Sequence, residues 1–157
     1  MKWNKFIKLM SVAMIGVTLT STLTGCSDDD SDSSEQSSQV SHKPTKKQRL
    51  NKEVKRLQKA YKGKAKVAYN KKWNAITITP TSQDFTEAVT TLINSGEGES
   101  QDWKDLTNSL KELSNTVIQN TEVANISVAL VNPNNTDKVL YTARDGKTTY
   151  DLAKDSN

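Results

Sequence analysis

One stretch near the start of the chain limits what the rest can fold into. Residues 27–42, SDDDSDSSEQSSQVSH, contain a single apolar side chain, that of Val40. A segment that can bury so little apolar surface does not recover the conformational entropy lost on ordering. We therefore predict that residues 26–44 form a disordered, acidic, serine-rich tether. The only histidine, His42, lies in this tether, and we expect it to be solvated.

The first 25 residues have the layout of an export signal. Three lysines and no acid stand within the first eight residues, and an apolar run, LMSVAMIGV (9–17), follows them. A helix that spans a bilayer needs about 20 apolar residues in succession, so this run is too short for a transmembrane anchor. The run is followed by the tetrapeptide LTGC (23–26). We predict that residues 1–25 are a signal peptide.

The tetrapeptide LTGC resembles the lipobox of bacterial lipoproteins, in which leucine and two small residues precede a cysteine. The resemblance implies that diacylglycerol is attached to the Cys26 thiol and that a peptidase then cuts between Gly25 and Cys26. Two acyl chains, such as palmitate, hold a protein stably at a membrane, whereas one alone is marginal. The alternative is an ordinary secretory peptide with an incidental cysteine. A lone cysteine also excludes an internal disulfide.

Apolar periodicity begins in a basic segment, residues 45–63. Its apolar side chains recur at steps of three and four, which predicts an amphipathic helix capped by Thr45 and ended by Gly63. The apolar stripe could dock on the rest of the domain or lie in the membrane interface, and charge alone does not choose between the two. The stripe consists of Leu50, Val54, Leu57 and Tyr61.

Residues 64–157 carry the pattern of a small mixed domain. Alternating apolar residues predict short strands, and Asp145-Gly146 is a type I′ hairpin signal. Helical spacing over 85–93 and 103–117 predicts two helices, entered through Thr81 and Ser100. Because hairpins flank the helices, we predict an α+β fold. It would have an antiparallel sheet of about five strands with two helices on one face, preceded by the basic helix.

Charge is unevenly distributed along the chain. The net charge is +4, but three lysines lie before Cys26, so the chain from Cys26 onward carries +1. Between Lys43 and Lys72 there are thirteen bases and one acid, Glu53. Such a block fits a solvated helix face, or a surface that contacts anionic headgroups or teichoic acid phosphates. The candidate contact residues are Lys52, Lys55, Arg56, Lys59, Lys71 and Lys72.

Residues suited to catalysis are scarce in the sequence. A nucleophile needs a base beside it, yet the only histidine lies in the tether and the only cysteine is the predicted lipidation site. The sequence has no phosphate-binding loop and no zinc or calcium motif. Asp102 and Asp105 stand at a predicted helix start, where acids are favoured by the helix dipole. We therefore predict no enzymatic activity, no cofactor and no metal, and we do not expect nucleic acid as a partner outside the cytoplasm.

The two tryptophans of the predicted domain have different expected roles. Trp103 opens an apolar stripe and is predicted to lie in the core. Trp73 stands in a predicted turn beside Lys71 and Lys72, which fits packing on the sheet and surface contact equally well.

Taken together, these features predict a lipoprotein anchored on the extracytoplasmic face of the cell membrane. It would present a small, non-catalytic interaction domain to a protein partner that the sequence does not identify. The chain resembles small uncharacterised lipoproteins of Gram-positive bacteria. One alternative is a superinfection-exclusion lipoprotein of prophage type, which blocks DNA entry of a competing phage and shares size, anchor and basic charge. Another is an accessory lipoprotein of a transporter or envelope complex.

Overall fold

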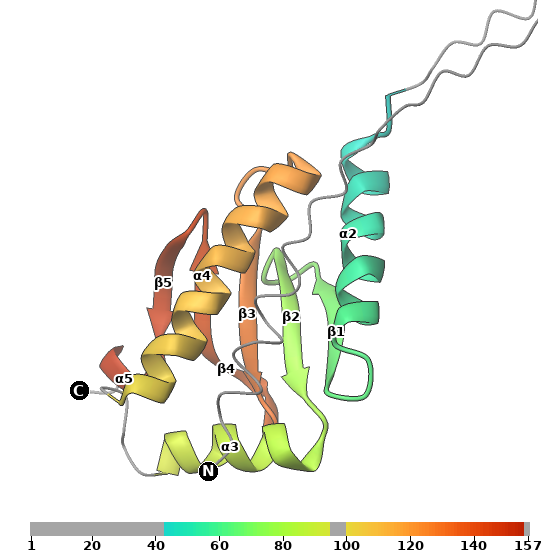
Figure 1. Ribbon diagram of the computed structural model, residues 1–157. Coiled ribbons are helices and arrows are strands. Elements are labelled where there is room, and N and C mark those ends of the chain that lie inside the picture. Colours follow the sequence, from blue (N-terminus) through green and yellow to red (C-terminus); the bar gives the residue numbers. More distant parts are fainter. Residues whose placement is uncertain (1–42, 95–99, 156–157) are drawn as a thin grey trace, which may run out of the picture.

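The computed structural model describes residues 43–94 and 100–155. The predicted signal peptide, the lipobox and the predicted tether up to His42 lie outside them. The described chain forms one five-stranded sheet with helices, so the predicted α+β class is confirmed (Figure 1). In sheet order the strands are β1 (Ala65–Asn70), β2 (Ala75–Pro80), β3 (Ser127–Asn132), β4 (Asn135–Arg144) and β5 (Lys147–Asp151). The helices are α2 (Lys46–Ala60), α3 (Gln83–Asn94), α4 (Gln101–Thr121) and the short α5 (Leu152–Asp155).

Short polar side chains begin three of the helices. The Thr45 hydroxyl accepts from the backbone N–H of Gln48, whose side chain accepts from the N–H of Thr45 in return, which completes a capping box. Ser100 accepts from the N–H of Trp103 at the start of α4, as predicted. At α3 the cap is Ser82, whose hydroxyl accepts from Phe85, so the expected entry through Thr81 is wrong by one residue.

The prediction that the sheet is antiparallel throughout is wrong for one pair. Strands β1–β2, β3–β4 and β4–β5 are antiparallel hairpins, and Asp145 and Gly146 have positive φ angles (51° and 70°), as a type I′ turn requires. Strands β2 and β3, however, run parallel. The chain between them passes through α3 and α4, and the long α4 returns it to the end at which β2 began. A helical crossover of this kind joins parallel strands.

Helices α2 and α4 cover one face of the sheet. Helix α2 packs on β1 and on α4, and α4 packs on β3 and β4 (Figure 1). The apolar stripe of α2 is buried here, with Leu57 at 0% exposure, so the basic helix docks on the domain. Helix α3 lies across one end of the sheet rather than on the same face (Figure 1). The core beneath the helices includes Ile76, Ile78, Leu110, Val117, Val128 and Leu130.

The opposite face of the sheet has different chemistry. Because side chains alternate along a strand, Val128 and Leu130 enter the core under the helices while Ser127, Ala129 and Val131 point the other way. Small side chains are prominent on this second face. None of the long helices in the described ranges crosses it, so in this part of the chain the two faces of the sheet are not equivalent.

Candidate functional site

Five of the six predicted contact residues are exposed lysines, which form two groups, and the sixth, Arg56, has a different role. Lys52, Lys55 and Lys59 are exposed on α2, as a contact with an anionic surface requires. Lys71 and Lys72 are exposed on the hairpin between β1 and β2. The predicted lipidation site, Cys26, and the cleavage position after Gly25 lie outside the described residues.

Arg56, the sixth predicted contact residue, is engaged within the domain. Its Nη2 lies 2.6 Å from Oε1 of Glu53, and its Nε donates to Oε2 at 2.9 Å. The Glu53 side chain is 4% exposed and also accepts a hydrogen bond from Asn120 of α4. The hydrogen bonds to Glu53 raise the pKa of the Arg56 guanidinium above its usual value. Arg56 therefore neutralises a buried carboxylate at the seam between α2 and α4.

One end of the domain gathers further lysines. Helix α2 ends where β1 begins, so the hairpin after β1 lies at the same end of the molecule as the start of α2 (Figure 1). The described chain also starts there. Glu122, just after α4, also lies at this end and is already paired with Arg49, while Asp145 lies on the β4–β5 hairpin with the exposed Lys147 two residues on. We call this region the basic end. It is defined by five exposed lysines at the start of α2 and on the β1–β2 hairpin: Lys43, Lys46, Lys47, Lys71 and Lys72.

The first turn of α2 is unusual in its charge. It contains Lys46 and Lys47 and no acid. The partial positive charge at a helix start disfavours cations by about 0.3–1 kcal/mol each. These two lysines therefore do not stabilise the helix in which they lie.

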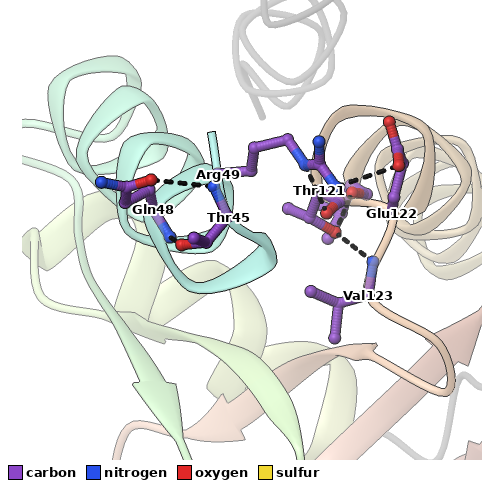
Figure 2. Close-up of polar contacts among 7 residues, drawn as sticks. Thr45, Gln48, Arg49, Thr121, Glu122 and Val123 are labelled. Atoms are coloured by element: carbon purple, nitrogen blue, oxygen red, sulfur yellow. Dashed lines mark hydrogen bonds and ion pairs between the residues drawn. The ribbon is translucent and has the colours of Figure 1, made fainter. Parts of the chain in front are cut away.

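Figure 2 shows how α2 is fixed to α4 at the basic end. Arg49 donates from Nε to the carbonyl oxygen of Thr121 at 3.1 Å and from Nη2 to Oε2 of Glu122 at 2.9 Å (Figure 2). Thr121 is the last residue of α4, where carbonyl groups lack partners within the helix and cations are favoured. Glu122 then leaves the helix in a left-handed conformation, with φ of 52°. Arg49 of α2 thus caps the C-terminal end of α4.

A hollow of about 600 Å³ lies on the second face of the sheet, and we call it the sheet hollow. Its floor comes from small residues on neighbouring strands: Ala75 pairs with Ser127, and Ala129 pairs with Thr142. Larger side chains stand around this floor, among them Trp73, Tyr150 and Leu152. Small residues side by side on adjacent strands therefore lower the middle of the face relative to its rim. Binding pockets for small molecules commonly have volumes of about 300–1,000 Å³.

The charged side chains that line the sheet hollow are both positive. Arg144 and Lys138 line it, and no aspartate or glutamate of the described ranges does. Arg144 donates from Nε to the Ser127 hydroxyl at 3.0 Å, which orients its guanidinium beside the floor. Neither cation has an ion-pair partner among the described residues. Sequence reasoning missed this site because it depends on cross-strand register.

The structure also answers the question of the two tryptophans. Trp103 is buried, as predicted, at 3% exposure, and its indole N–H donates to Asp151 at 3.1 Å. Its ring meets that of Tyr141 edge to face, with centroids 6.4 Å apart. Trp73 is half-buried on the hairpin and contributes to the rim of the sheet hollow. Its position therefore combines packing on the sheet with access to solvent.

Across residues 43–94 and 100–155, no group of three or more His, Cys, Asp or Glu side chains is placed to hold a metal ion. Within the same ranges, no helix is long and apolar enough to cross a membrane. Comparison with known protein families, curated proteins and solved structures gave no match to this chain.

Proposed function

We propose that this chain is a bacterial lipoprotein, anchored through Cys26 on the extracytoplasmic face of the cell membrane, whose domain is a non-catalytic binding module. The basic end of the domain would face the anionic membrane or wall surface. The observation that carries this proposal is the position of the basic end, because its five exposed lysines lie where the chain enters the domain. An anchor upstream of Lys43 would attach the domain to the membrane through that end.

The charge at the start of α2 supports a role in binding. Lys46 and Lys47 oppose the helix dipole, so stability alone does not account for them. A lysine close to an anionic surface gains about 1 kcal/mol, and this gain falls off over a Debye length of about 8 Å at physiological salt. Five such lysines would orient a domain that lipid already holds at the surface.

The anchor is tested by metabolic labelling. Cells that express the wild-type chain should incorporate a labelled fatty acid into it, and the Cys26→Ala variant should remain unlabelled. Labelling of the variant, or none of the wild type, would refute lipidation at Cys26.

The orientation is tested with the chain from Cys26 onward, produced without lipid, and vesicles that contain phosphatidylglycerol. The test variant carries glutamate at Lys46, Lys47, Lys71 and Lys72. A matched control carries the same charge change at Lys52, Lys55 and Lys59 on the exposed side of α2 and at Lys62 in the turn after it.

We expect the wild-type chain to co-sediment with the vesicles at low salt and to be released as salt rises. The test variant should lose most binding, and the control should retain more of it. The test variant should remain folded, because acids at a helix start are favourable. Equal loss in both variants would reject the basic end as the specific contact, and no binding by the wild type would reject surface contact altogether.

A further inference from the structure

The sheet hollow has an apolar interior that extends along the strands. The floor follows β3 from Ser127 through Ala129, and Val139 on β4 continues it toward the far end of the sheet. Six residues of extended strand cover roughly 20 Å. An elongated apolar body fits this shape better than a compact polar one.

Cations stand at the two ends of this floor. Lys138 lies near the start of β4 and Arg144 is its last residue, so the two Cα atoms are roughly 20 Å apart along the strand. The bond from Arg144 to Ser127 uses only Nε, and no other hydrogen bond of the guanidinium is recorded among the described residues. Its two terminal nitrogens are therefore available to a carboxylate or phosphate, groups that arginine binds with paired hydrogen bonds.

Aromatic side chains complete the rim. Trp73 stands on the β1–β2 hairpin, and Tyr150 lies opposite Thr142 across the β4–β5 pair. Neither the indole N–H of Trp73 nor the hydroxyl of Tyr150 has a hydrogen-bond partner among the described residues. Both residues are half-buried and line the hollow, and each side chain combines an apolar ring with one polar hydrogen-bonding group.

We propose that the sheet hollow binds a single-chain amphipathic anion, with its hydrocarbon chain along the floor and its carboxylate or phosphate at Arg144. A free fatty acid and a lysophospholipid both have this chemistry. The argument for this ligand is charge complementarity, since two cations border an apolar floor and no acid among residues 43–94 and 100–155 does. This inference does not depend on the anchor at Cys26.

Trp73 provides the readout for a binding experiment. The chain from Cys26 onward contains two tryptophans, and Trp103 is buried and bonded to Asp151. A change in tryptophan fluorescence on addition of ligand therefore reports on Trp73. Palmitate and lysophosphatidylglycerol, each below its micellar concentration, are titrated separately into the lipid-free chain, and calorimetry measures the same binding independently.

Two variants and one control test the placement of the ligand. Arg144→Glu should weaken binding by roughly tenfold to a hundredfold, because it removes a charged hydrogen-bond donor from the anionic group. Thr142→Phe places a bulky side chain of high strand propensity in the middle of the floor and should abolish binding without unfolding the sheet. The control, Lys62→Glu, introduces a glutamate at an exposed position outside the hollow and should bind as the wild type does.

The outcomes separate the two ligands and can overturn the proposal. A blue shift with either ligand, lost in Thr142→Phe, supports it. Binding of palmitate alone assigns the carboxylate, and binding of the lysophospholipid alone assigns the phosphate. Absence of both the fluorescence change and the heat with both ligands overturns the proposal. The proposal is also overturned if Thr142→Phe and Arg144→Glu both bind with wild-type affinity in calorimetry. Circular dichroism must show that both variants are folded.

Discussion

Replacing Arg56 with alanine should destabilise the domain far more than removing any neighbouring lysine. Glu53 is 4% exposed and has three hydrogen bonds from side chains, two of them from Arg56. Without Arg56, a buried carboxylate keeps one amide donor, that of Asn120. Breaking a buried ion pair by removing one partner costs about 3–5 kcal/mol. Because the Arg56 side chain is 32% exposed and water can enter its place, we expect the lower figure, about 3 kcal/mol.

The measurement is thermal and urea unfolding followed by circular dichroism. For a domain of this size about 1 kcal/mol corresponds to about 4 °C, so Arg56→Ala should lower the midpoint by roughly 12 °C. Lys55→Ala, at an exposed neighbouring position, is the control and should change it by no more than about 2 °C.

A double variant distinguishes the loss of a partner from the value of the pair. Replacing Glu53 and Arg56 together by leucine removes both charges, and such replacements are often neutral or stabilising. The double variant should therefore be more stable than Arg56→Ala. If Arg56→Ala costs less than about 1 kcal/mol, or no more than Lys55→Ala, then the carboxylate does not depend on this arginine and the reasoning fails.

Three further changes test the packing. Tyr61→Phe should stabilise the domain by roughly 1 kcal/mol in urea unfolding, because the buried Tyr61 hydroxyl has no hydrogen-bond partner among the described residues. Burial raises the pKa of Tyr61 to about 12, so the wild type should lose stability between pH 10 and pH 12, and the variant should lose less there. Asp151→Ala should cost roughly 1–3 kcal/mol because it leaves the buried Trp103 indole N–H without its acceptor, while Asp151→Asn should retain most of that stability. Gly146→Ala should cost about 1 kcal/mol in thermal unfolding, since Gly146 has a φ angle of 70°.

Local patterns predicted most of the secondary structure, because each depends on residues close in sequence. The helix cap at Thr45, the cap at Ser100 and the hairpin at Asp145-Gly146 were all confirmed. The parallel pairing of β2 with β3 was not predicted, because it follows from the path of α3 and α4 through space. A hairpin signal predicts the pairing within one hairpin, but not which strands of two hairpins pair or in which direction.

The candidate site was harder to predict, because it depends on contacts between distant residues. The sequence singled out an excess of bases, but it did not show that Arg56 serves the buried Glu53 rather than a partner. The floor of the sheet hollow includes Ala75 and Ala129, whose side chains carry no functional group. Their contribution to a site follows only from the pairing of their strands, which the sequence does not show. A lone acid in a basic block is a signal that could have pointed to Glu53.

The clamp between Arg49 and the end of α4 has a mechanical consequence. Any load on the chain upstream of Lys43 enters the domain through the first turn of α2, and Arg49 lies one turn into that helix. Its bonds to Thr121 and Glu122 pass the pull to α4, which rests on the central strands β3 and β4. Tension is therefore shared between the edge strand β1, on which α2 also packs, and the middle of the sheet.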